Sequence, residues 1–127
     1  MQAFERNKVR IRYGGRMMRA NNYQQLAART INKRLDNNGV LKHGVFGLCS
    51  EAGEVAGILQ KVYQGHPFDT GHLKKELGDC LWMIAEICTA TGFKLEDVMR
   101  LNIEKLKARY PEGFTADNSL HRQEGDI

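Results

Sequence analysis

Residues 47–60 read GLCSEAGEVAGILQ, a mostly apolar run that contains two glutamates, Glu51 and Glu54, three positions apart. A later stretch, KKELGDCLWMIAEI, repeats this pattern with Glu76 and Asp79. Residues three apart lie on the same side of an α-helix, where two like charges destabilise it. Both stretches have the apolar spacing of helices. Their paired acids therefore need an explanation.

Helical angles place one acid of each pair toward the core. At 100° per residue from Leu48, the apolar residues of the first stretch fill an arc from about 280° to 40°, with Glu51 at about 300° and Glu54 at about 240°. The acids of the second stretch fall at about the same two angles, 300° and 240°. A single acid at such an edge would simply be solvated. Four acids on two facing helices must instead be neutralised, paired or bound to a metal.

The types of residue in the two stretches indicate which metal. Four carboxylates suit Mg²⁺, with Mn²⁺ as an alternative, because both cations prefer oxygen ligands. Di-iron bundles use Glu-x-x-His, whereas the residues three positions beyond Glu54 and Asp79 are Gly57 and Trp82. The histidines are expected to be surface residues in or near loops rather than ligands: His43, His66, His72 and His121.

Cap and turn residues divide the chain into helices. Asn21 or Asn22 is expected to cap a helix over YQQLAARTINKRL, which DNNG at 36–39 breaks, and Asp69 or Thr70 to cap a helix that ends near Gly92. The other two helices are expected from Leu41 or Gly44 to Tyr63, and from Leu95 to Arg109. Apart from an ambiguous VRIRY near the start, nothing alternates like a strand. The predicted fold class is all-α, with four helices.

The last of these helices carries a polar strip beside its apolar side. Asn102, Lys105 and Arg109 fall at about 280° to 340° counted from Leu95, and Lys61 follows Glu54 by two turns on the same rim. Taken alone, this strip could be the basic flank of a solvated helix. Next to four acids and a cation, it is interpreted as an anion clamp of the kind that phosphoryl chemistry requires.

Composition restricts the class of protein. The chain has 127 residues, 42% hydrophobic and 27% charged, which predicts one soluble globular domain. No apolar run is long enough for a membrane span, and no secretory signal is readable. The three cysteines, Cys49, Cys80 and Cys88, lie in apolar helical patterns and are expected to be reduced core thiols of a cytoplasmic protein.

The positive charge is concentrated at the start of the chain. The net charge is +4, but residues 1–20 alone carry +5 and the remaining 107 residues sum to −1. Such a basic extension is expected to be solvated or to pack on another subunit. Nucleic-acid binding is the alternative, and it is not the expectation because no aromatic interleaving or base-reading motif accompanies the charges.

Three blocks in this order resemble a known family: EAGE at 51–54, ELGDCLW at 76–82 and NIEKLKARYPEGF at 102–114. They resemble the MazG-like nucleoside triphosphate pyrophosphohydrolases of the all-α NTP pyrophosphatase superfamily, whose signature is ExxE followed by ExxD. The resemblance extends over about residues 22–122, including YQQLAART and the late SLHR. It implies a domain at 21–122, preceded by a basic extension at 1–20 and followed by a tail at 123–127.

The resemblance also implies an all-α four-helix bundle that a homodimer or homotetramer completes, and an activity: hydrolysis of a nucleoside or deoxynucleoside triphosphate to the monophosphate and pyrophosphate. Water is expected to attack the α-phosphorus while an acid of the cluster accepts its proton; which acid does so is left open. The metal-binding and catalytic positions match Glu51, Glu54, Glu76 and Asp79. The positions that usually face the phosphates match Lys61, Asn102, Lys105, Arg109 and Tyr110.

Two departures from the family leave base specificity open. The basic extension lies outside the pattern, and Met83 follows Trp82 where relatives often carry Tyr. The alternatives to the predicted activity are a non-catalytic nucleotide-binding or regulatory module for helical oligomerisation, which the intact set of acids disfavours, and a related phosphoribosyl-ATP pyrophosphohydrolase or dimeric dUTPase.

Overall fold

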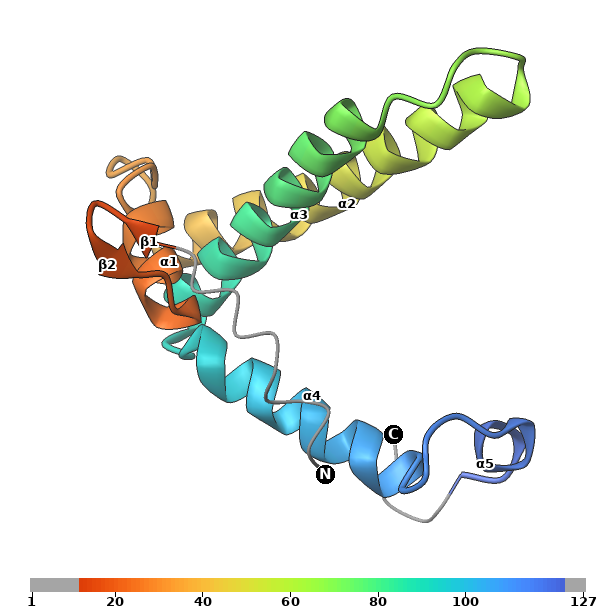
Figure 1. Ribbon diagram of the computed structural model, residues 1–127. Helices are drawn as coiled ribbons and strands as arrows, with labels where there is room; N and C mark the ends of the chain where they lie inside the picture. The colour runs from red at the N-terminus through yellow and green to blue at the C-terminus, as the bar shows by residue number, and fades with distance from the viewer. Residues whose placement is uncertain (1–11, 123–127) are drawn as a thin grey trace.

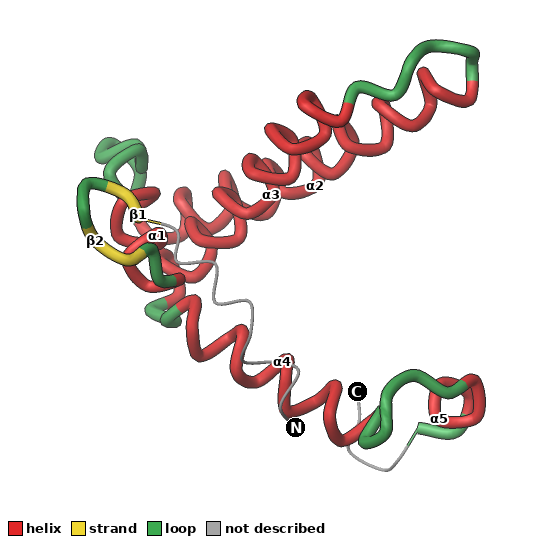
Figure 2. Tube along the Cα trace, in the orientation of Figure 1, coloured by secondary structure: helices red, strands yellow, loops and turns green. Residues whose placement is uncertain are grey.

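A computed structural model describes residues 12–122 of the chain, so the first eleven and the last five residues fall outside this range. A small antiparallel hairpin precedes the helices (Figures 1 and 2). The elements are β1 (Arg12–Tyr13), β2 (Arg16–Met17), α1 (Ala20–Ala28), α2 (Asn37–Tyr63), α3 (Thr70–Thr91), α4 (Leu95–Arg109) and α5 (Ala116–Leu120). The predicted tail at 123–127 lies outside the described residues.

The helices form an open V (Figure 1). Helices α2 and α3 run side by side as one arm, α1 and the β-hairpin lie at the vertex, and α4 leads away as the other arm to α5. The prediction of a mainly helical fold is confirmed. Within one chain, α4 packs on α1 and diverges from the α2–α3 pair, so completion of the four-helix bundle by a second copy stays a prediction.

The first two helices differ from the predicted bounds. Helix α1 ends at Ala28 rather than near Leu35. The backbone amides that follow Ala28 donate to carbonyls three residues back rather than four, which ends the α-helical pattern. The Thr30 hydroxyl also donates to the Ala27 carbonyl, at 2.7 Å. Helix α2 begins at Asn37, because the Asp36 carboxylate accepts the Gly39 amide at 2.7 Å. The DNNG sequence is therefore the start of a helix.

The bounds of the next two helices agree with the prediction. The Asp69 carboxylate caps α3 by accepting the His72 amide at 2.9 Å, and Gly92 closes the helix with a φ of 78°. Helix α4 spans Leu95–Arg109, and Pro111 follows soon after its end. The short helix α5 was not predicted.

A β-hairpin lies within the predicted basic extension. Arg12 pairs with Met17 and Tyr13 with Arg16, so Gly14 and Gly15 occupy the two central turn positions. Both glycines have positive φ, 57° and 78°, as a tight turn that follows the strand twist requires. The end of the ambiguous VRIRY segment is thus a strand, and the all-α expectation omitted it.

Small residues let α2 approach α3 closely. A Cβ at Gly44 would lie 2.8 Å from Ile87 Cγ1, and one at Gly47 would lie 2.2 Å from Met83 Sδ. A Cβ at Gly53 or Gly78, near the acids, would meet nothing within 4 Å among the described residues, apart from its own stretch of helix. The close packing of the pair therefore depends on the first two glycines.

A second core lies at the vertex, where α1, α3 and α4 meet. Ala85, Cys88 and Leu95 are fully buried there, and Ala20, Tyr23, Ala27 and Ile84 pack around them. Of the cysteines, only Cys88 fits the predicted core position, since Cys80 is half-buried and Cys49 is exposed; all three are free. No helix among residues 12–122 is long and apolar enough to cross a membrane.

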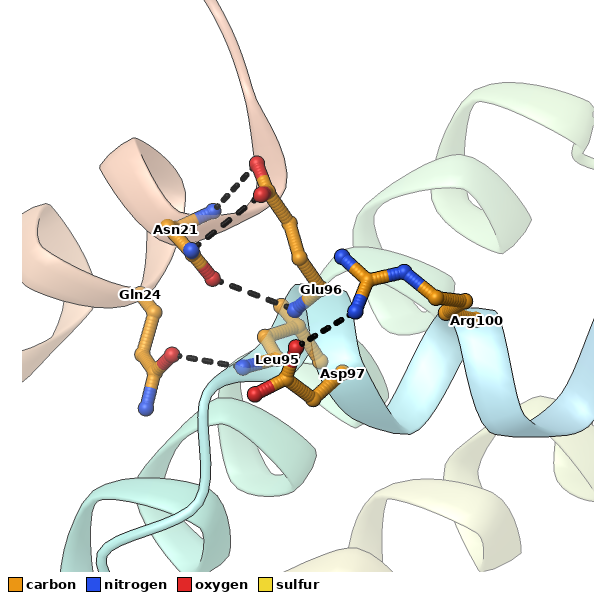
Figure 3. Close-up of polar contacts among 6 residues, drawn as sticks. All are labelled: Asn21, Gln24, Leu95, Glu96, Asp97 and Arg100. Carbon is orange, nitrogen blue, oxygen red and sulfur yellow. Dashed lines mark hydrogen bonds and ion pairs between the residues drawn. The ribbon is translucent and has the colours of Figure 1, made fainter.

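Side chains of α1 cap α4 across the vertex (Figure 3). The Gln24 carbonyl oxygen accepts the Leu95 amide at 2.8 Å, and the Asn21 carbonyl oxygen accepts the Glu96 amide at 3.1 Å. In return, the Asn21 amide group donates to the Glu96 carboxylate at 3.2 Å. Lys94, the N-cap residue of α4, supplies no side-chain cap of its own. These bonds tie the start of α4 to α1.

Candidate active site

The α2–α3 pair brings three of the four predicted acids to one point. Ligand oxygens of Glu51 on α2 and of Glu76 and Asp79 on α3 lie within 4.8 Å of one another, and all three residues are half-buried. Glu51 lies on the side of α2 that faces α3, as its position within the apolar arc predicts. The close packing of the two helices therefore brings it to Glu76 and Asp79. A set of carboxylate oxygens suits a hard divalent cation such as Mg²⁺ or Mn²⁺.

Both loss of water and the charges of neighbouring acids act on Glu51. Its removal from water raises the pKa of this carboxyl, and the charges of Asp79 and Glu76 raise the pKa further. A hydrogen bond with Glu76 and the charge of Glu54 act in the same direction. Because a divalent cation would relieve this repulsion, the electrostatics of the site also fit one.

Glu54 differs from the other three acids. It is exposed and is not among the carboxylates that converge within 4.8 Å, although its charge is felt at Glu51. Its position agrees with its predicted angle at the edge of the apolar arc. Its assignment as a ligand stays a prediction.

A histidine beside the acids was not identified as part of the site. His72 Nε2 lies 2.7 Å from Glu76 Oε1, one helical turn away on α3. Groups that bond a ligand carboxylate in this way fix its orientation. The signal in the sequence was the four-residue spacing between His72 and Glu76.

His43 likewise contacts a buried acid, Glu86, with Nδ1 2.8 Å from Oε1. The prediction of surface histidines holds for His43, which is exposed, and in part for His72, which is half-buried.

The predicted phosphate-binding residues lie on two different arms of the V. Lys61 is exposed near the end of α2, and Asn102 is exposed on α4. Lys105, Arg109 and Tyr110 are half-buried on or just beyond α4, the arm that leads away from the α2–α3 pair. The Arg109 guanidinium lies 6.0 Å from the centre of the Tyr110 ring.

The fold and this cluster define a class: a mainly helical protein whose antiparallel helix pair presents three converging carboxylates, the kind of oxygen donors that a divalent cation prefers. A family model described as the MazG nucleotide pyrophosphohydrolase domain matches residues 44–114, and the chain belongs to this family. All three converging acids lie within the matched region, whereas the β-hairpin and α1 precede it. Membership supports a hydrolase that acts on nucleotides.

One relative is a protein of Mycobacterium phage L5 called Gene 37 protein. It is 30% identical over 87 residues, which cover 65% of this chain and 76% of the relative. No solved structure matches the chain significantly.

Proposed function

We propose that this protein hydrolyses a nucleoside or deoxynucleoside triphosphate to the monophosphate and pyrophosphate, with Mg²⁺ or Mn²⁺ as cofactor. The observation that supports this most directly is the convergence of Glu51, Glu76 and Asp79 between α2 and α3 in a member of the MazG family. Glu54 is proposed as the fourth ligand.

The acids have two roles in this proposal. Together they hold the cation, and one of them accepts the proton of the water that attacks the α-phosphorus. Mg²⁺, when bound, supplies positive charge for the phosphates and makes water more acidic. His72 orients the Glu76 carboxylate through its 2.7 Å contact. Removing water from Glu51 strengthens the interactions of its charge.

The phosphates are proposed to bind Lys61, Asn102, Lys105, Arg109 and Tyr110. Because α4 diverges from the acids of its own chain, we propose that a second copy in a homodimer or homotetramer brings its α4 to them. The apolar residues that α4 exposes support this assembly: Val98, Met99, Leu101, Ile103 and Leu106. A cytoplasmic location, without a nucleic-acid partner, stays a prediction from the sequence.

Product analysis tests the proposal. A panel of ribo- and deoxynucleoside triphosphates, with phosphoribosyl-ATP, is incubated with Mg²⁺, with Mn²⁺ and with EDTA, and the products are separated by chromatography. Monophosphate and pyrophosphate are expected with either metal, and neither product in EDTA. Diphosphate and orthophosphate would exclude the proposed bond, and full activity in EDTA would exclude the metal. Nucleotide binding without turnover would indicate a non-catalytic regulatory module. Activity restricted to dUTP or phosphoribosyl-ATP would indicate one of the related enzymes.

A further inference from the structure

An aromatic pocket of about 440 Å³ lies between the β-hairpin, α1 and α3. Its rings come from all three elements: Tyr13 from the hairpin, Tyr23 from α1 and Trp82 from α3. Met18 and Leu26 complete much of its apolar lining. Its volume is within the range of pockets that bind small molecules.

The pocket adjoins the acid cluster. Trp82 follows Asp79 by three residues on α3, so the two side chains lie on neighbouring turns of one helix side. A molecule with its charged end at the acids would therefore have this pocket for its uncharged end.

Hydrogen bonds hold the ring of Trp82 in place. Its Nε1 donates to the Thr30 hydroxyl at 2.9 Å, and that hydroxyl donates to the Ala27 carbonyl at 2.7 Å. The indole is thus fixed before any ligand arrives, and both donors are already used. The lining is mainly apolar and includes flat aromatic rings, which suits stacking by a planar ring.

Tyr13 is placed where it would cover such a ring. It lines the pocket from the hairpin, yet 67% of its surface is exposed to solvent. The Gly14–Gly15 turn, with both φ values positive, holds the hairpin in a tight conformation. An exposed tyrosine facing a fixed tryptophan across an apolar pocket is an incomplete stacking site.

We propose that this pocket binds the base of the nucleotide, stacked on Trp82 and covered by Tyr13 of the β-hairpin. This inference rests on the proposed function and adds to it an element that precedes the matched residues 44–114. Stacking tolerates every base, so the enzyme discriminates weakly between bases, with kcat/KM values within about tenfold of one another.

Trp82 is the only tryptophan of the chain, so its fluorescence reports on the pocket directly. The probes are α,β-methylene-ATP, which resists cleavage at the proposed bond, and sodium tripolyphosphate, which has no base. The ATP analogue is expected to change Trp82 emission, and tripolyphosphate is expected to leave it unchanged. Equal changes with both probes would overturn the proposal.

Variants at Tyr13 identify the covering ring. Tyr13→Ala is expected to weaken binding of the ATP analogue about fivefold or more, measured by calorimetry, without changing tripolyphosphate binding. Tyr13→Phe is expected to retain the affinity, because stacking needs the ring and not the hydroxyl. Tyr63→Ala, at a tyrosine 95% exposed at the end of α2, is the matched control and should bind like wild type.

These experiments distinguish a failure of the base-binding inference from a failure of the proposed hydrolysis. If Tyr13→Ala binds the ATP analogue with unchanged affinity, the inference is overturned. If Tyr13→Ala changes only the sedimentation of the protein, a second copy of the chain covers the pocket, and the inference is also overturned. If hydrolysis persists in either case, the proposed function stands. Binding that depends on the base and on Tyr13, without any hydrolysis, would refute the proposed function and leave the pocket assigned.

Discussion

At the scale of residues, the two acids of the EAGE block have different surroundings. Glu51 is half-buried among Glu76 and Asp79, whereas Glu54 is exposed one turn along α2. The raised pKa of Glu51 records the cost of its charge there, which is due to burial and to its neighbours. Substitutions that remove charge but keep shape distinguish a metal ligand from a structural acid.

Glu51→Gln is expected to leave the metal-free protein as stable as wild type or more so, because it removes repulsion. In the wild type, Mg²⁺ at about one hundred times its Kd should add about 2.7 kcal/mol to the free energy of unfolding. The variant should lose most of this gain and most of its turnover. Thermal melts with EDTA and with Mg²⁺ measure both effects.

Two further variants complete this experiment. Glu104→Gln, at an exposed acid of α4, is the control and should respond to Mg²⁺ like wild type. Glu54→Gln should lose part of the Mg²⁺ response if Glu54 is the fourth ligand. A Glu51→Gln protein that is destabilised in EDTA yet still gains stability from Mg²⁺ would mean that Glu51 has a structural role instead.

Lys105 and Arg109 are tested in the same way by removing their charges. Changing either to Ala is expected to lower kcat/KM by about 10²-fold, as for other charges that stabilise a transition state. Lys107→Ala is the control on the same helix, because Lys107 is an exposed lysine on its solvent side. Equal activities in all three variants would contradict a role for Lys105 and Arg109 in phosphate binding.

At the scale of elements, the site depends on how closely α2 and α3 pack. Gly44 is buried, and an added Cβ would lie 2.8 Å from Ile87 Cγ1, too close for two carbon atoms, with Ile87 N and Met83 O in contact at 3.4 Å. The Ile87 side chain would have to shift, and the α3 backbone in contact behind it leaves the new methyl group no other space. A larger residue at Gly44 would therefore separate the helices that carry the acids.

Gly44→Ala is accordingly expected to destabilise the protein by about 1–3 kcal/mol, despite the better helix propensity of alanine. Gly71→Ala is the control, because a Cβ at that exposed glycine would meet only Asp69 Oδ1, at 3.5 Å. Thermal melts in EDTA compare the two variants, and the Mg²⁺ response shows whether the acids still converge. A Gly44→Ala protein as stable as wild type would contradict the packing argument.

At the scale of the whole molecule, the open V leaves apolar surface without a partner in the chain. Leu101 is 70% exposed and Ile103 51% exposed on α4, the arm that carries the proposed phosphate-binding residues. A shared interface would cover this surface and bring α4 of one copy to the acids of another. Association and activity are therefore expected to depend on each other.

Ile103→Glu should disrupt the assembly while leaving the fold of the chain intact, because Ile103 is half exposed within one chain. Sedimentation at micromolar concentration is expected to show a dimer or tetramer for wild type and smaller species for the variant, with helix content unchanged by circular dichroism. Activity should fall with association. An active monomer, of either wild type or variant, would refute the proposed assembly.

The sequence alone determined what depends on neighbours along the chain. The bounds of α3 and α4 followed from Asp69, Gly92 and Pro111, whose effects act within a helical turn. The convergence of Glu51 with the acids of α3 followed from helical angles, because a helix fixes the side on which each residue lies. The order of the acidic blocks was enough to indicate the family.

Only the tertiary structure decided features that join distant parts of the chain. The early end of α1 involves a bond between Thr30 and Trp82, and the direction of α4 involves Gln24 and Leu95. No local pattern predicts such contacts, because each depends on how whole helices pack. The glycines illustrate this: Gly44 and Gly53 lie on one helix, yet only Gly44 faces the α3 backbone. The packing partner, rather than the residue type, determines what each glycine contributes.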